Sequence, residues 1–255
     1  MWSKLKKLAR KIVRVVKALV RAAIRVALLV ITFPFKIWDL VFGFLGWPRK
    51  GIKLHIAVLQ GPDGPLITTA DLNDLLPSIE LLKRAYKDHC NVTVSPYSSG
   101  NKREIDNWAQ VLDDQPPPAA LDVPGCSFFG SLWENETGDS GEYFRRHTAG
   151  WVGGLPISLA FPITVYIVKS IGGTPGYFGC TVPFLTDYLV VGVDALKVEP
   201  STIGHEMGHR CNILPHSDDP SNLMFDGRSQ TLPPYRLKGW QRNLLRSSRH
   251  VTYMF

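Results

Sequence analysis

Cations and apolar residues alternate with helical spacing over the first part of the chain. Leucine, isoleucine and valine fill the positions between cations, which predicts a helix with a basic stripe and a broad apolar face. The cations that form the stripe are Lys4, Lys7, Lys11, Arg14, Lys17, Arg21 and Arg25. Residues 26–47 then run almost wholly apolar and are rich in Trp and Phe.

Residues 1–47 predict association with an anionic membrane surface, where each cation near the surface contributes about 1 kcal/mol. Residues 26–47 are long enough to span a bilayer, but Lys36 and Asp39 lie near the middle of that stretch and Pro34 would kink a helix there. A single-pass helix, a hairpin in one leaflet and an interfacial helix therefore all stay open. The alternative is a helix that packs on the protein's own core or on a partner.

The pattern changes at residues 47–51 (Trp-Pro-Arg-Lys-Gly), which we interpret as the boundary between an N-terminal membrane-associating segment, residues 1–50, and a catalytic domain, residues 51–255. Period-2 and period-3.6 runs alternate in this domain. They predict strands at 53–60, 92–97, 163–171, 179–184 and 187–193, helices at 69–89, 101–113 and from Ser201, and a long loop region over 113–162. This order predicts an α+β fold with a mixed, mostly parallel sheet.

The net charge of +7 is unevenly distributed. Residues 1–53 carry thirteen Lys and Arg against one acid, and the remainder is net negative, so we expect no nucleic-acid binding. Near the C-terminus Lys238, Arg242, Arg246 and Arg249 recur with helical spacing, which predicts the solvated face of a terminal helix. Four cysteines are too few for a disulfide scaffold, although Cys180 and Cys211 could pair.

Residues 205–224 (HEMGHRCNILPHSDDPSNLM) carry the candidate chemistry. His205 and His209 lie four apart, so they share one face of a helix and can hold one metal ion. Glu206 is placed to act on a water at the metal rather than to bind the metal. His216 supplies a third imidazole, which leaves a fourth position open, as a catalytic zinc site requires. The alternative is a surface helix with two solvated histidines.

The same segment resembles the metzincin clan of zinc peptidases, and its matrixin-type members most closely, on H-E-x-x-H-x-x-G-x-x-H followed by a methionine turn. His205, Glu206 and His209 match directly, and Met224 matches the turn residue. Asn212 stands at the glycine position, where it can adopt the left-handed conformation. One additional residue puts His216 one position beyond the usual third ligand, so Asp218 or Asp219 stays open as an alternative ligand.

The resemblance implies a zinc-dependent endopeptidase that cleaves a protein or peptide substrate, with Glu206 as general base and zinc on His205, His209 and His216. Tyr235 follows the methionine turn, where some members of the clan place a tyrosine that assists the oxyanion; a core aromatic is the alternative. Two other functions stay open. One is a membrane-permeabilising effector with a folded carrier domain, and the other is a catalytically inactive zinc-binding module.

Overall fold

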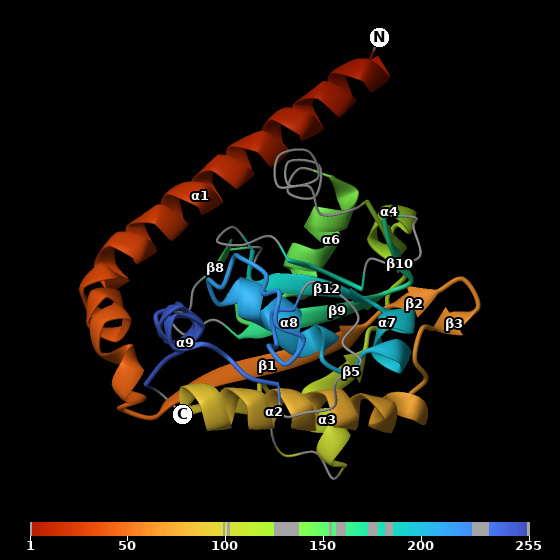
Figure 1. The fold of residues 1–255 in the computed structure, drawn as a ribbon. Helices are drawn as coiled ribbons and strands as arrows, with labels where there is room; N and C mark the ends of the chain where they lie inside the picture. Colours follow the sequence, from red (N-terminus) through yellow and green to blue (C-terminus); the bar gives the residue numbers. More distant parts are fainter. Residues whose placement is uncertain are drawn as a thin grey trace.

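A single long helix runs past a folded body (Figure 1). The computed structural model describes residues 2–98, 100, 103–124, 138–152, 155–156, 162–172, 178–181, 186–225 and 235–253. Helix α1 (Trp2–Phe42) continues through Pro34, and the short 3-10 helix η1 (Gly43–Leu45) follows it. Among these described residues, no helix has both the length and the apolar character needed to cross a membrane.

A six-stranded sheet forms the centre of the body, in the order β11-β12-β9-β1-β4 with β5 also paired to β1. Its strands are β1 (Lys50–Val58), β4 (Val92–Pro96), β5 (Ala109–Val111), β9 (Ile163–Val168), β11 (Gly179–Thr181) and β12 (Tyr188–Gly192). Among the described strands of this sheet, β11 and β12 pair antiparallel and all other pairs are parallel. The prediction of a mixed, mostly parallel sheet is therefore confirmed, but helices alternate with its strands, so the class is α/β rather than the predicted α+β.

Both faces of the sheet are covered, which explains why its central strands are apolar without a break. All residues of β9 and β12 are buried. Helices α2 (Leu76–Cys90) and α8 (Thr202–Arg210) pack in the same apolar cluster as one face of β1. Helices α4 (Pro118–Leu121) and α6 (Asp139–His147) contribute to the cluster on the other face. The segment from His205, which carries the candidate ligands, therefore starts on a helix that is fixed by the core.

The remaining elements are short. They are the 3-10 helix η2 (Asp71–Leu75), α3 (Glu104–Trp108), α7 (Val193–Val198) and α9 (Gly239–Arg246), and the strand pairs β2 (Gln60–Gly61) with β3 (Gly64–Pro65), β6 (Asp122–Val123) with β10 (Ser170–Ile171), and β7 (Trp151–Val152) with β8 (Leu155–Pro156).

Two predicted elements differ in the structure. The helix predicted over residues 101–113 ends at Trp108, and residues 109–111 form β5, because the central strand β1 offers them a parallel hydrogen-bonding edge. The loop region predicted over residues 113–162 contains α4 and α6. In both places long-range packing overrides the local pattern.

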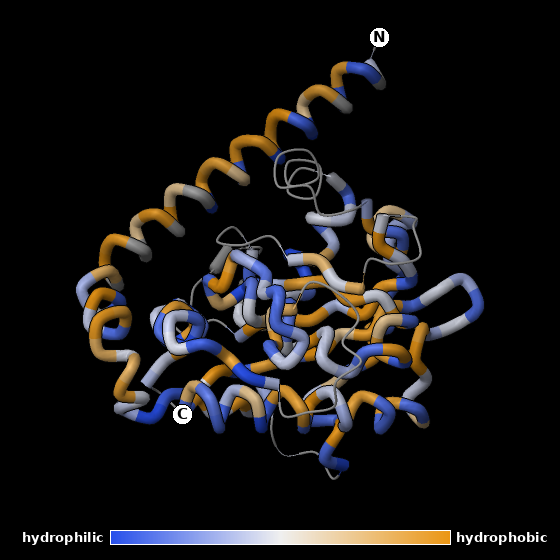
Figure 2. The backbone as a smooth tube through the Cα atoms, in the orientation of Figure 1, coloured by the Kyte–Doolittle hydropathy of each residue, from blue (hydrophilic) through white to orange (hydrophobic). Residues whose placement is uncertain are grey.

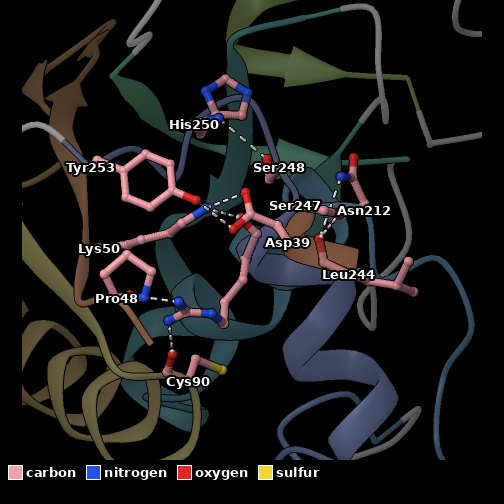
Figure 3. Close-up of polar contacts among 11 residues, drawn as sticks. Asp39, Pro48, Lys50, Cys90, Asn212, Leu244, Ser247, Ser248, His250 and Tyr253 are labelled. Atoms are coloured by element: carbon pink, nitrogen blue, oxygen red, sulfur yellow. Dashed lines mark hydrogen bonds and ion pairs between the residues drawn. The ribbon is translucent and has the colours of Figure 1, made fainter. Parts of the chain in front are cut away.

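The prediction that the C-terminal helix has a solvated basic face is also wrong. Arg246 is fully buried, and its guanidinium donates to the carbonyl oxygens of Cys90 (2.7 Å) and Pro48 (2.6 Å) (Figure 3). Arg249 is half-buried and pairs with the buried Asp187. A guanidinium has five N–H donors, so it can satisfy carbonyl oxygens and carboxylates inside the protein.

The cysteines do not pair as considered. Cys211 is free and buried, as is Cys90, whereas Cys180 is disulfide-bonded. Burial raises the pKa of both free thiols to about 12, which keeps them protonated at neutral pH. They act as small apolar side chains of the core.

Candidate metal centre

Three histidine side chains converge, two from α8 and one from the segment that follows it. The Nε2 atom of His209 lies 3.1 Å from Nε2 of His205 and 3.0 Å from Nε2 of His216. Among the described residues, these three form the one group of His, Cys, Asp or Glu side chains that could hold a metal ion, with ligand atoms within 4.8 Å of one another. The third histidine is therefore brought to the other two despite the additional residue before it.

In His205 and His209 the other ring nitrogen, Nδ1, faces a backbone carbonyl. Nδ1 of His205 lies 3.0 Å from the Leu223 oxygen, and Nδ1 of His209 lies 2.7 Å from the Ile213 oxygen. A carbonyl can only accept, so Nδ1 carries the proton in both rings and Nε2 presents a lone pair. Burial lowers the pKa of His209, which also favours the neutral imidazole that a metal requires.

The end of α8 positions the carbonyl that holds His209. Asn212 has a φ of 75°, so the prediction that it takes the left-handed conformation is confirmed. Its N–H donates to the His209 oxygen (3.1 Å) and the Ile213 N–H donates to the Gly208 oxygen (3.0 Å). These two bonds form a Schellman motif, which ends the helix and turns the Ile213 carbonyl back towards the His209 ring.

Met224 packs beneath the helix that carries the histidines. It is fully buried, and a Cβ atom added to Gly208 would lie 2.4 Å from its sulfur, so only glycine fits at that position without displacing it. The turn around Met224 is closed by hydrogen bonds from Ser217 N to the Met224 oxygen (2.7 Å) and from Met224 N to Asn222 Oδ1 (2.9 Å). The same turn presents the Leu223 carbonyl to His205.

Glu206 lies beside the histidines but is not part of their group. Its carboxylate is buried, and Oε2 accepts a hydrogen bond of 2.7 Å from the hydroxyl of Thr181 on β11. A Cβ atom added to Gly179, on the same strand, would lie 2.3 Å from Glu206 Cγ. Burial raises the pKa of Glu206, while His209, the Thr181 hydroxyl and His216 oppose that rise.

Thr181 and Gly179 contact Glu206 although nothing in the local sequence indicates it. They lie 25 and 27 residues before Glu206, and β11 is brought to α8 only by its antiparallel pairing with β12. The sequence did predict a strand over residues 179–184, which contains both residues, but it did not place that strand beside Glu206.

The two aspartates that the sequence left open as alternative ligands, Asp218 and Asp219, lie outside the group of three histidines. Asp219 is exposed and accepts hydrogen bonds from Ser221 N (2.9 Å) and Ser221 Oγ (2.8 Å), which hold its pKa below the usual range. Asp218 is exposed as well, and neither carboxylate belongs to the group that could hold a metal. The structure thus favours His216 over both.

Tyr235 and Ser201 both contact Glu199. The buried Tyr235 hydroxyl donates to Glu199 Oε1 (3.2 Å), and the Ser201 hydroxyl donates to the same oxygen (2.6 Å). Helix α8 begins directly after Ser201, as predicted, but the structure shows no side-chain cap at its start. Tyr235 thus contacts a residue three positions before the start of α8, and its role at the oxyanion stays a prediction.

These residues form three imidazole nitrogens around one point, with a buried carboxylate next to them on the same helix. Such a set can hold one divalent cation of the transition series and place a base beside it. In comparisons with known proteins, no family model and no curated protein matches the chain.

Proposed function

We propose that the protein is a zinc-dependent endopeptidase of metzincin type, with His205, His209 and His216 as the metal ligands. The observation that carries the proposal is the convergence of three Nε2 atoms beside the buried carboxylate of Glu206. An all-histidine set with an open position is typical of catalytic zinc. A bound zinc ion would polarise the scissile carbonyl and lower the pKa of a water molecule.

The spacing of the three nitrogens supports this metal. Two nitrogens that each lie about 2.05 Å from a tetrahedral zinc ion are roughly 3.3 Å apart. The separations of 3.1 Å and 3.0 Å at His209 are close to that value. The carbonyl oxygens of Leu223 and Ile213 provide the second layer of hydrogen bonds that orients histidine ligands in metal sites.

Glu206 acts as general base and then as general acid. It takes a proton from the attacking water and gives it to the leaving amine. Burial raises the pKa of Glu206, which makes its carboxylate a stronger proton acceptor than an exposed one and so suits it to the first of these steps. The Thr181 hydroxyl holds Oε2, and Gly179 leaves room for the side chain.

Residues 1–47 hold this enzyme at an anionic membrane surface in our proposal. The exposed apolar side chains of α1 also favour a second candidate function, membrane permeabilisation by α1 with the folded body as a carrier. The variant Glu206→Gln distinguishes the two functions. If permeabilisation is the function, Glu206→Gln keeps full biological effect and a peptide of residues 1–47 releases dye from anionic vesicles.

Elemental analysis and a peptidase assay on the full-length chain test the enzyme. We expect one zinc per chain in the wild type and in Glu206→Gln, weaker zinc binding in His216→Ala, and loss of peptide cleavage in both variants. Cleavage is measured by mass spectrometry on a digest of denatured casein.

A wild type that holds no zinc overturns the proposal. Zinc loss in Glu206→Gln would make that side chain a ligand instead of the base. Equal zinc in His216→Ala and the wild type would move the third ligand to Asp218 or Asp219. Zinc without any cleavage by the wild type would leave an inactive zinc-binding module.

A further inference from the structure

One row of side chains along α1 is apolar and exposed. Its members recur every three or four residues, so they form a single face of the helix. They are Leu5, Leu8, Ile12, Val16, Leu19, Ala23, Val26, Val30, Phe33, Ile37 and Val41. The large residues of this row are 45–69% exposed. Figure 2 shows hydrophobic segments that recur along the length of α1, with hydrophilic segments between them.

The opposite flank of α1 faces the body. Arg14 forms ion pairs with Asp139 (2.6 Å) and Glu142 (3.1 Å) in the first turn of α6. Arg21 is buried, as is Asp39 further along the helix. Arg14 is offset by two positions from the apolar row, and two positions correspond to about 200° around a helix. The apolar row therefore points away from the body.

A buried cluster fixes the C-terminal part of α1 to the body (Figure 3). The Asp39 carboxylate pairs with the ammonium group of Lys50, the first residue of β1, and accepts a hydrogen bond of 2.9 Å from the Tyr253 hydroxyl. Lys50 is 1% exposed and also donates to the Arg246 carbonyl (3.0 Å). We call these residues, Asp39, Lys50, Arg246 and Tyr253, the Asp39 clamp. Because of this clamp, the one acid of α1 is neutralised inside the protein.

The remaining charges of α1 match an anionic partner. Among the side chains of α1 that the structure describes, the exposed cations are Lys4, Lys6, Arg10, Lys11 and Lys17, and none of them belongs to the apolar row. A surface that accepts an apolar row with cations along its border has an apolar interior below a layer of negative charge, which describes an anionic lipid leaflet.

The length of the helix indicates its orientation. Helix α1 has 41 residues and is therefore roughly 60 Å long, about twice the hydrocarbon thickness of a bilayer. Exposed cations occur from Lys4 to Lys17. If α1 spanned the bilayer, this part of the helix would either place its charges in the hydrocarbon or extend far beyond the membrane, so spanning is disfavoured.

We infer that α1 lies in the plane of an anionic bilayer, with its apolar row inserted into one leaflet and the body held on the water side by the Asp39 clamp. This inference specifies the membrane part of the proposed function and is independent of peptide cleavage. Lys36 and Asp39, whose charges disfavour a spanning helix, are compatible with an in-plane helix. Asp39 is buried against the body, and Lys36 is half-buried on the same flank.

Depth measurements on the full-length chain test the orientation. Spin labels on Ile12→Cys and Val30→Cys report the apolar row at two places, and Lys11→Cys is the matched control on the flank. The free cysteines Cys90 and Cys211 are fully buried, and the signal of the unsubstituted chain is subtracted. We expect equal, shallow depth below the headgroups for both apolar sites on phosphatidylglycerol vesicles, and a label outside the hydrocarbon at Lys11→Cys. Depth that differs between the two apolar sites, with one near the bilayer centre, overturns the in-plane orientation.

Vesicle sedimentation tests the partner. The variant Val16→Glu with Val30→Glu places charge on the exposed row, and its thermal unfolding midpoint checks that the fold is kept. We expect binding to phosphatidylglycerol vesicles to fall at least tenfold in this variant and, for the wild type, to weaken with added salt. Equal binding of variant and wild type, or equal binding to neutral phosphatidylcholine vesicles, overturns the inference. These outcomes leave the zinc and casein experiments unaffected, so the two proposals fail separately.

Discussion

Helices α8 and α1 have opposite designs. Helix α8 is short and mostly buried, and its functional side chains are each held by a specific hydrogen bond, as His209 is by the Ile213 carbonyl and Glu206 by Thr181. Helix α1 is long, and its apolar row is exposed along its length. In the functions that we propose, α8 therefore depends on a few fixed atoms, whereas α1 depends on many interchangeable contacts, except at the Asp39 clamp.

Asp39→Asn gives the largest effect that we expect, because it breaks the one place where α1 depends on a single buried pair. Removing the charge leaves the ammonium group of Lys50 buried without its partner, which costs about 3–5 kcal/mol. Chemical denaturation measures the loss of unfolding free energy. The double variant Asp39→Asn with Lys50→Met should recover part of it, and an unchanged stability of Asp39→Asn would mean that α1 is not clamped.

Gly179→Ala tests how closely the centre is fitted. The added Cβ atom would lie 2.3 Å from Glu206 Cγ, so the carboxylate must move away from its position beside the histidines. We expect casein cleavage to fall about a hundredfold, the lower part of the range for a general base, with zinc content unchanged. Gly239→Ala is the matched control, since nothing lies within 4 Å of its added Cβ atom. Equal activity of the two variants would contradict the role of Glu206.

Thr181→Val should change activity least of these variants. Its effect should appear in the pH dependence of peptide cleavage. The hydroxyl of Thr181 opposes the rise in the pKa of Glu206, so its removal raises that pKa further. Activity requires the ionised carboxylate, and it is lost as pH falls through this pKa. The acidic limb of the kcat/KM profile should therefore move to higher pH in Thr181→Val and stay in place in Thr181→Ser. A profile that does not move in Thr181→Val would show that the hydroxyl has no influence on Glu206.

The sequence predicted features that depend on neighbours in the chain. The strands of the sheet were recognisable because β-branched residues follow one another in β9 and β12. The left-handed conformation of Asn212 was implied by the resemblance, in which Asn212 stands at the glycine position. His216 could be named as a ligand candidate because only six residues separate it from His209.

Features that depend on the tertiary fold could not be read in the same way. The hydrogen bond of Thr181 to Glu206 exists because β11 pairs with β12. Arg246 has the spacing of a solvated residue, yet its guanidinium reaches the carbonyls of Pro48 and Cys90. Nothing in the order of residues indicates that Asp39 would pair with Lys50, because the turn between them decides whether they meet.

The Asp39 clamp also has a mechanical consequence. Lys50 begins β1, and β1 is bonded in parallel to β4, β5 and β9. A force on α1, such as a pull on the body against the membrane, enters the sheet along the axis of its central strand. Parallel ladders then carry the load in shear, with many hydrogen bonds strained together rather than one after another. In our proposal, the helix that binds the membrane is thus joined directly to a strand with parallel neighbours on both sides.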